Sequence, residues 1–466
     1  MTSKRIHKVE QLILAIDIGS SKICSLIADL KNGTPHIIGV GVQQSRGVRK
    51  GTITNIEQAS SAIRESVNEA KRMAGTNISQ AYISLSGACT KSTNMGGIIN
   101  NPNNDIGIQE INRVMQTALY NAKSMIPSNY EVIHVLPYFF KLDDREYVDD
   151  PFGMSGARLE VSTHIVYVQK SALDNLKKVV KNAGIEVIGI VLNAYASSIA
   201  VLNNDEKEMG VGCIDMGASS CDIMIHHGNS MQYDDFLGVG SGHITNDIVL
   251  GLNTPIPAAD MIKIKYATLN ELTPEDLDST LEIPTNTDDS RRVSLEILHS
   301  IVFSRVLETL QIIEQSIERS GLRNNMGAGI VITGGMAYMN GLKELAKGVF
   351  MNLPIRIAEP KEVNESFKLL KSRDTPYASY STAVGLILYA SGKFTNYELD
   401  SNKKLKHTQN ARSSQKSNLS DLEVKENDLT DLEVIKNKED DIRIKKIKEK
   451  RNGVTEKVVD FFKKMF

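Results

Sequence analysis

The sequence predicts an α/β protein of two related lobes, with a small α+β insertion in the first lobe and a carboxyl-terminal tail of different character. Three observations support this prediction. Short β-rich runs, such as 11–17, 210–216 and 328–335, alternate with helical stretches, such as 56–74 and 108–125, as is typical of sheets covered by helices. An Asp-x-Gly motif follows an apolar strand twice, a whole lobe apart. After Phe394 the chain becomes rich in Lys, Asp, Glu, Asn and Ser.

The composition excludes several classes of protein. Of the 466 residues 41% are hydrophobic, which is enough for a sizeable core. The formal net charge is only -2, so we expect no nucleic-acid partner, because phosphate binding needs an excess of clustered positive charge. The four cysteines have no metal-site spacing, which argues against zinc and disulfides and favours a reducing, cytoplasmic compartment. No apolar run is long enough to span a membrane.

The pattern along the chain divides it into segments. Residues 84–165 contain a Gly/Asn-rich stretch, one amphipathic helix and two strand-like segments, and we interpret them as the small α+β insertion. The other segments follow the lobes. The first lobe comprises 1–83, 166–205 and a return helix at 383–397; the second comprises 206–242, a subdomain at 243–325, and 326–382; the tail comprises a disordered linker at 398–452 and an amphipathic helix at 453–466.

The repeated motif points to phosphate binding. Residues 17–22 and 215–222 each end an apolar strand in Asp-x-Gly, continue with small hydroxyl residues and start a second strand. Such a hairpin turn exposes backbone amides. Glycine allows close approach and positive φ, and successive amides with Ser hydroxyls form an anion-binding concavity. Asp17 and Asp215 would hold Mg²⁺ through water, because a carboxylate repels phosphate directly. Two copies predict two lobes gripping one nucleotide phosphate chain.

A third element supports nucleotide binding. The strand within 328–333 runs into Gly334 and Gly335, and a helix is expected from Asn340 to Phe350. The two glycines remove side chains where a flat base or ribose can lie against the backbone. Together with the two Asp-Gly turns, this turn predicts that the chain binds ATP with Mg²⁺.

These motifs resemble those of the actin/Hsp70/sugar-kinase ATPase superfamily and, within it, the FtsA family of bacterial cell-division proteins. Residues 17–22 resemble the first phosphate motif, 215–222 the second and 329–335 the adenosine motif. Segments 193–198 and 380–385 resemble the two helices that join the lobes. The resemblance covers residues 11 to about 395 and implies a two-lobed actin-like ATPase fold.

The resemblance also implies a set of site residues. Residues around Asp260 and Lys263 resemble the helix that reaches ribose and base, although the family usually has Glu in place of Asp260. Ala218 and Ser219 stand where the family has glycines, so phosphate binding requires that φ stays negative there. The expected nucleotide-binding residues are Asp17, Gly19, Ser20, Ser21, Lys22, Asp215, Gly217, Ala218, Ser219, Ser220, Gly242, Asp260, Lys263, Gly334, Gly335 and Met336.

The tail ends in an amphipathic pattern. At 100° per residue, residues 453–466 place Val454, Val458, Val459, Phe461, Phe462, Met465 and Phe466 on one face, and the charged residues on the other. A helix of this length is too short to span a bilayer but can lie in its interface, and the basic run 443–451 before it favours anionic lipid. We expect it to bind membrane lipids rather than to dock on a protein.

By resemblance, the chain is expected to be an ATP-binding scaffold with at most weak ATPase activity, for which no catalytic residue can be assigned. It would self-associate, tether FtsZ filaments of the Z ring to the cytoplasmic face of the cell membrane at the septum as a peripheral protein, and recruit later division proteins. Arg305 aligns with a position implicated in FtsZ contact. Alternatives are a pilus-assembly actin homologue, a small-molecule kinase and an Hsp70-type chaperone, none of which explains the tail.

Overall fold

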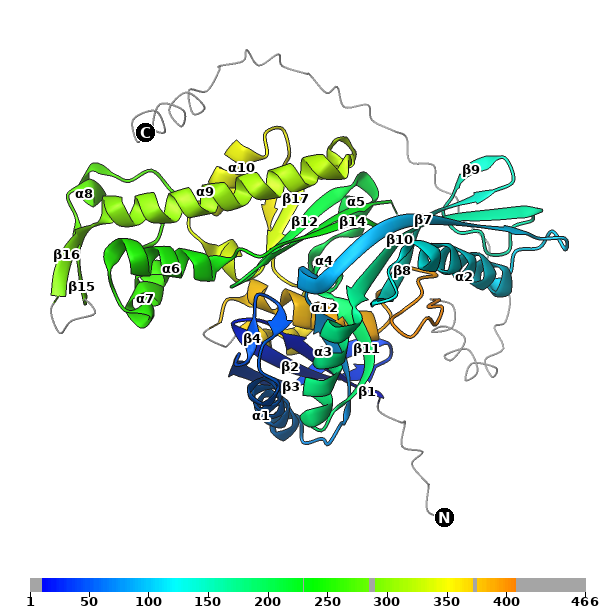
Figure 1. The fold of residues 1–466 in the computed structure, drawn as a ribbon, viewed down its shortest axis with the longest axis horizontal. Helices are drawn as coiled ribbons and strands as arrows, with labels where there is room; N and C mark the ends of the chain where they lie inside the picture. The colour runs from blue at the N-terminus through cyan, green and yellow to red at the C-terminus, as the bar shows by residue number, and fades with distance from the viewer. Residues whose placement is uncertain (1–10, 229, 285–289, 372–374, 408–466) are drawn as a thin grey trace, which may run out of the picture. The chain divides into compact units, whose positions relative to one another are not determined.

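The computed structural model describes residues 11–228, 230–284, 290–371 and 375–407 (Figure 1). The linker from residue 408 and the amphipathic helix predicted at 453–466 therefore lie outside the described residues. None of the helices in the described ranges is long and apolar enough to cross a membrane.

The first lobe is a five-stranded sheet in the order β11-β6-β1-β2-β3, in which β1 and β2 form an antiparallel hairpin and β6 and β11 run parallel to β1. Helix α1 begins at the Asn55 cap, whose side chain accepts from the Gln58 amide, and ends at Gly75 with φ 64°. The elements are β1 (Gln11–Ile18), β2 (Lys22–Lys31), β3 (Thr34–Gln44), β4 (Val48–Arg49), β5 (Thr52–Ile53), α1 (Ile56–Ala74), β6 (Gln80–Leu85), α3 (Lys170–Asn182) and β11 (Glu186–Leu192).

The second lobe repeats this arrangement with the order β14-β13-β12-β17-β18. Strand β12 pairs antiparallel with β13 and parallel with β17, as β1 does with β2 and β6. The duplication of the Asp-Gly motif is therefore matched by a duplication of the sheet. The elements are α5 (Asn204–Met209), β12 (Val211–Met216), β13 (Cys221–His227), β14 (Ser230–Leu237), α6 (Ser241–Leu252), α7 (Ile256–Tyr266), α8 (Pro274–Leu277), β15 (Thr280–Pro284), β16 (Ser290–Ser294), α9 (Leu295–Ser320), β17 (Ile330–Thr333), α10 (Leu342–Val349) and β18 (Ile355–Ile357). Helix α11 (Lys368–Lys371) follows them in the chain but packs on β3 of the first lobe, although the sequence predicted it within the second.

Two buried helices join the lobes, α4 (Asn193–Val201) and α12 (Ser381–Ala390). Both are buried on nearly all sides and mostly apolar, as expected of helices surrounded by protein. They approach so closely that a Cβ atom on Gly385 would lie 1.8 Å from the Ala196 carbonyl oxygen. Only glycine permits this contact. The helices correspond to the two segments that the sequence analysis assigned to the junction.

The insertion is confirmed as a small α+β subdomain with its own core (Figure 1). A short 3₁₀ helix, η1 (Gly87–Cys89), leads into a four-stranded antiparallel sheet of order β7-β10-β8-β9, and α2 packs on β7 and β10. Its elements are β7 (Thr90–Asn100), α2 (Ile108–Met125), β8 (Tyr130–Leu142), β9 (Arg145–Val148) and β10 (Arg158–Gln169).

The expected start of the linker is wrong. Residues 395–407, here called the strap, pack between the first lobe and the insertion instead of forming a linker from 398. Leu399 is fully buried and exchanges two backbone hydrogen bonds with Val135 of β8, at 3.1 and 3.0 Å. The strap also covers the outer edge of β11, where Ser401 Oγ accepts from the Ile190 amide at 3.1 Å and Asn402 donates to the Ile188 carbonyl at 2.9 Å.

Glu398 anchors the strap in the protein interior. Its carboxyl group is fully buried and accepts from the hydroxyls of Tyr195 on α4, at 2.6 Å, and Tyr389 on α12, at 2.5 Å. Burial raises the pKa of Glu398 to about 7, despite the lowering effect of the two tyrosine hydroxyls and Lys406. In the unfolded chain the same group titrates near its ordinary value of 4.5.

This pKa predicts a pH dependence of stability. Between pH 4.5 and 7 the folded protein holds a proton on Glu398 that the unfolded chain releases, so the free energy of unfolding falls as pH rises, by about 3 kcal/mol in total. Glu398→Gln keeps an acceptor but cannot titrate. The difference in unfolding free energy between wild type and Glu398→Gln, measured by urea denaturation at several pH values, should change across this window and be constant above pH 7. A difference independent of pH from 4.5 to 7 would contradict the buried proton.

Candidate nucleotide-binding site

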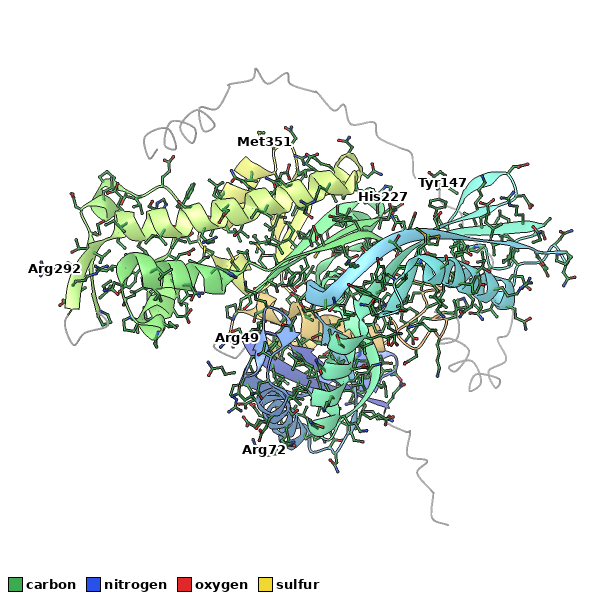
Figure 2. The ribbon with its side chains drawn as sticks, in the orientation of Figure 1. Arg49, Arg72, Tyr147, His227, Arg292 and Met351 are labelled. Atoms are coloured by element: carbon green, nitrogen blue, oxygen red, sulfur yellow. The ribbon has the colours of Figure 1, made fainter. Side chains whose placement is uncertain are left out.

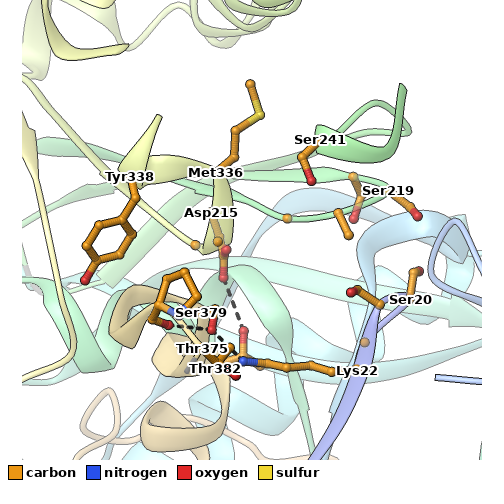
Figure 3. A pocket seen from close by; sticks show the side chains of 18 of the residues that line it. Ser20, Lys22, Asp215, Ser219, Ser241, Met336, Tyr338, Thr375, Ser379 and Thr382 are labelled. Atoms are coloured by element: carbon orange, nitrogen blue, oxygen red, sulfur yellow. Dashed lines mark hydrogen bonds between the residues drawn. The ribbon is translucent and has the colours of Figure 1, made fainter. Parts of the chain in front are cut away.

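The two Asp-Gly turns face one cavity of about 600 Å³ between the lobes (Figure 3). Every residue predicted to bind nucleotide lines this cavity except Gly242, whose amide instead donates to the Ala218 carbonyl at 2.7 Å and supports the second turn. The structure therefore brings together residues that lie about 200 positions apart in the sequence. That they bind a nucleotide stays a prediction.

The two turns have the same geometry. The Gly19 amide donates to the Lys22 carbonyl at 3.1 Å, and the Gly217 amide donates to the Ser220 carbonyl at 2.8 Å. The expectation of positive φ at these glycines is wrong, because neither has one. Glycine is favoured by close approach instead: a Cβ atom would lie 2.8 Å from the Lys22 oxygen in the first turn and 3.1 Å from the Ser220 oxygen in the second.

The turns leave amides available to an anion. In the described part of the chain the backbone N–H groups of Ser20 and Ser21, and of Ala218 and Ser219, have no hydrogen-bond acceptor. Neither Ala218 nor Ser219 has a positive φ, so the replacement of the usual glycines does not strain the second turn. The condition that the sequence analysis set for phosphate binding is met.

Three aspartates surround the inner end of the cavity. Asp17 accepts from Ser84 Oγ at 3.0 Å, and Asp215 accepts from Thr382 Oγ1 at 3.2 Å. Burial raises the pKa of both carboxyls to about 6, and Asp17 contributes further to the rise at Asp215. Burial, with the charge of Asp215 next, raises the pKa of Asp222 to about 8. A cation near these groups would offset their mutual repulsion.

The aspartates are not arranged as a direct ligand cage. Across the residues that the structure describes, no three His, Cys, Asp or Glu side chains converge as metal ligands. That Asp17 and Asp215 would reach Mg²⁺ through water, of which Mg²⁺ usually keeps several, stays a prediction.

Lys22 crosses the cavity toward α12. Its ammonium donates to Ser379 Oγ at 2.5 Å and lies 3.8 Å from the centroid of the Tyr380 ring (Figure 3). Burial lowers the pKa of Lys22. Neither Ser379 nor Tyr380 was predicted in the site, although Tyr380 begins the segment predicted at the lobe junction and Ser379 precedes it.

The opposite end of the cavity is lined by α7 and the turn after β17. Lys263 donates to Asp260 Oδ1 at 2.6 Å and to Thr245 Oγ1 at 2.8 Å, so both predicted residues are present but bound to each other. Among the cavity-lining residues that were not predicted from the sequence are Tyr338, Met339, Asn340, Thr375 and Pro376. They follow the predicted Gly-Gly turn or precede α12, and only the fold brings these two segments together.

Gly334 is required by the fold itself. The sequence analysis expected a glycine that leaves room for base or ribose, but a Cβ atom at residue 334 would lie 2.4 Å from Asp215 Oδ1 and 2.5 Å from the Met216 carbonyl oxygen. Its φ of 91° also lies outside the range of other residues. Gly334 therefore packs the turn after β17 against the second Asp-Gly turn, whereas a Cβ atom on Gly335 would make only an ordinary contact, 3.6 Å from Ser379 Cβ.

This packing predicts opposite effects for two glycines. Gly334→Ala should lower the free energy of unfolding by more than about 2 kcal/mol, because it adds strain and a clash. Gly348→Ala, in α10, adds a Cβ atom with nothing within 4 Å and should raise stability by about 0.5–1 kcal/mol. Urea denaturation of both variants checks this, and equal stability of the two would contradict it.

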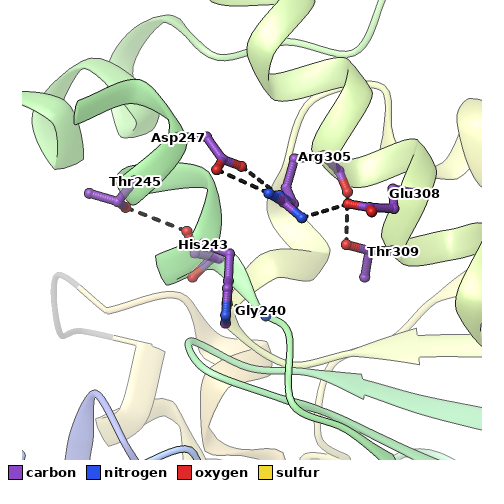
Figure 4. A network of polar contacts seen from close by, with 8 residues as sticks. Gly240, His243, Thr245, Asp247, Arg305, Glu308 and Thr309 are labelled. Carbon is purple, nitrogen blue, oxygen red and sulfur yellow. Dashed lines mark hydrogen bonds and ion pairs between the residues drawn. The ribbon is translucent and has the colours of Figure 1, made fainter. Parts of the chain in front are cut away.

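Arg305 is held within the second lobe (Figure 4). From α9 its guanidinium forms two bonds to the Asp247 carboxylate on α6, at 2.5 and 3.0 Å, and a third to Glu308 at 2.5 Å. Its side chain is 28% exposed. Arg305 thus ties α9 to α6, and the predicted contact with FtsZ stays a prediction.

Comparison with known proteins decides the family. A family model described as cell division protein FtsA matches residues 212–385, and a model described as the SHS2 domain inserted in FtsA matches residues 87–167. The cell division protein FtsA of Helicobacter pylori is 42% identical over 422 residues, which cover 85% of this chain and 84% of that protein. The chain belongs to the FtsA family. The FtsA resemblance and the SHS2-like insertion are both confirmed.

Solved structures confirm the actin-like fold of this FtsA chain. The chain is similar to a protein in the PilM-PilN type IV pilus biogenesis complex, with a TM-score of 0.59 and 16% identity over 82% of this chain and 99% of that one. It is also similar to MreB5 of Spiroplasma citri bound to ADP, with a TM-score of 0.50 and 13% identity over 82% and 97%. At these identities the likeness concerns the fold alone.

Proposed function

We propose that this FtsA-family chain binds ATP with Mg²⁺ between its lobes, self-associates, and tethers FtsZ filaments of the Z ring to the cytoplasmic face of the cell membrane. One observation carries the proposal: two equivalent Asp-Gly turns, one from each duplicated sheet, face a single cavity with unpaired amides. Membership of a cell-division family supports the cellular role, including recruitment of later division proteins.

The amides and charged side chains that line the cavity fit a nucleoside triphosphate. The free amides of both turns and the Lys22 ammonium would bind phosphate oxygens. Asp17 and Asp215 would hold water-bound Mg²⁺, which when present neutralises phosphate charge. Asp260 and Lys263 line the same cavity and would contact the ribose and base, and Gly335 presents no side chain to them. The similar fold of MreB5 bound to ADP supports this assignment.

ATP in this site would act as a conformational ligand. Because its phosphates need turns from both lobes, ATP binds best to the arrangement in which the turns face each other, and so stabilises it. The residues assigned here would bind and orient the nucleotide, and we assign no residue to the activation of water. We therefore propose a scaffold that uses ATP mainly to control its shape.

The tail would supply the membrane contact. One short amphipathic helix gives weak, reversible binding, but a self-associated row of chains would present many helices at once and multiply the attachment. A membrane anchor and self-association in the same protein would therefore strengthen each other.

The metal assignment predicts the effect of Asp215→Ala. Loss of the carboxylate should weaken Mg²⁺-dependent ATP binding at least about 10-fold and lower ATP-dependent assembly. Asp205→Ala, on the exposed α5, is the matched control and should bind as wild type does. Fluorescent ATP titration with and without Mg²⁺ measures this. Unchanged affinity and assembly of Asp215→Ala would reject the metal role.

The tether is tested by liposome flotation of FtsZ with ATP, comparing the full chain with one ending at Asn452. FtsZ should float only with the full chain. If this protein floats while FtsZ stays behind, the anchor stands and the FtsZ partner is wrong. If neither floats, the terminal segment docks on protein and the membrane proposal is wrong.

The proposed FtsZ contact of Arg305 needs a test that separates it from the Asp247 pair. Arg305→Gln should lower FtsZ capture in pull-down, whereas Asp247→Asn should not, because it frees the guanidinium. Arg319→Gln, on the same helix and also paired with an aspartate, is the control. If Asp247→Asn and Arg305→Gln lower capture equally, the pair acts by holding α6 on α9 and not by direct contact.

A further inference from the structure

We infer that contacts between the inserted subdomain and β14 hold the insertion on the second lobe. These contacts, centred on His164 and Asp234 and here called the latch, are coupled to nucleotide binding in the cleft. The coupling rests on the nucleotide binding proposed above. The contacts that make up the latch all lie within the part of the chain that the structure describes.

By chain connection the insertion belongs to the first lobe. It follows β6 through η1 and returns directly into α3, both at the first lobe's sheet. The strap adds further ties to the same lobe, since Leu399 pairs with Val135 of the insertion while Glu398 bonds Tyr195 and Tyr389 of the joining helices. The insertion is therefore fixed firmly on the side of the first lobe.

The insertion nevertheless contacts the second lobe. Strand β14 is the end strand of the second sheet, and it packs against β7, β8 and β10 of the insertion. There His164 Nε2 lies 2.7 Å from Asp234 Oδ1, and both side chains are buried, at 3% and 7% exposure. His164 Nδ1 in turn lies 2.7 Å from Asn94 Oδ1 on β7. A buried hydrogen-bonded contact between the insertion and the second lobe is costly to break, because each partner would lose its hydrogen bond.

The same region reaches the cleft. Asp222 lines the cavity and stands opposite Phe236 in the pairing of β13 with β14. At the first residue of η1, the Gly87 amide points to Asp222 Oδ1 at 3.4 Å. A Cβ atom on Gly87 would lie 3.0 Å from Phe236 Cβ. The residue that begins the insertion therefore rests on the wall of the nucleotide cavity.

This arrangement has a mechanical consequence. If the lobes separate when the cleft empties, β14 moves relative to an insertion that the first lobe holds, so the His164–Asp234 contact must break. By reciprocity, breaking the contact must lower the population of the arrangement that binds nucleotide, and with it the apparent affinity. The insertion would thereby be freed from the second lobe whenever the cleft is empty.

The first test measures ATP affinity in full-length variants. Asp234→Asn and His164→Gln lie outside the cavity, yet each should weaken ATP binding about 5-fold or more, and the double variant should be no weaker than the singles. Gly87→Ala adds a methyl group that pushes the insertion away from β14, and it should also weaken ATP binding. This variant replaces the other two if either of them misfolds. Arg158→Gln, at an exposed ion pair on the same strand as His164, is the control and should bind normally.

The second test measures the latch directly. Spin labels at Tyr147 of the insertion and Met351 of the second lobe, both exposed, report their separation by pulsed electron resonance in a Cys89→Ser background (Figure 2). A label pair at Tyr147 and Arg72, on α1 of the first lobe, is the reference. We expect Asp234→Asn to broaden the Tyr147–Met351 distance and ATP to narrow it in wild type, with the reference pair unchanged.

The outcomes separate the two proposals. If wild type binds no ATP, the proposed function is wrong, and the effect of Asp234→Asn on the distances alone decides whether the latch exists. If wild type binds ATP but the latch variants bind equally well, the coupling is wrong. If Asp234→Asn also leaves the Tyr147–Met351 distance unchanged, the latch itself is wrong.

Discussion

The close crossing of α4 and α12 is the constraint on which the other features depend. It exists because Gly385 has no side chain where the Ala196 carbonyl passes. Helix α12 then carries Thr382 to Asp215 and places Ser381 against Thr333 of β17, at 2.6 Å. At the other end of the same helix, Tyr389 meets Glu398 of the strap. One helix pair thus positions the second Asp-Gly turn and the last segment of the first lobe together.

The cleft contains aspartate carboxylates whose negative charges are not fully neutralised by positive groups of the chain. Three aspartates line the same cavity, and their partial removal from water raises the pKa of each. Without a bound cation, these carboxylates destabilise the folded state. Their arrangement therefore favours a ligand-binding role over a contribution to stability. Lys22, with Ser379 and Tyr380 as partners, is the cation that the chain itself supplies.

Local signals in the sequence were sufficient for the fold and for most of the cleft. The helices at 56–74 and 108–125 were predicted at their observed bounds because their apolar residues recur at helical spacing. The two turns were found because Asp-x-Gly after an apolar strand is a local pattern. Long-range contacts were not predictable in this way: the Lys22–Tyr380 contact joins opposite ends of the chain.

The strap shows the same limit in another form. Its polar composition resembles that of the tail, and only Tyr397, Leu399 and Leu405 are strongly apolar. The average composition hides these few residues, whereas in the structure each of them packs against the core of the insertion. Glu398 was unpredictable for the same reason, since a glutamate among lysines and aspartates suggests solvent and not a pair of tyrosine hydroxyls.

The cover that the strap places over β11 bears on aggregation. An open edge strand offers unpaired amides and carbonyls to any other strand, and is a template for uncontrolled edge-to-edge growth. A chain that is expected to self-associate at a membrane works at high local concentration, where that hazard is greatest. By occupying the Ile190 amide and the Ile188 carbonyl with side chains, Ser401 and Asn402 remove this template. Assembly is then left to side-chain surfaces, which can be regulated and reversed.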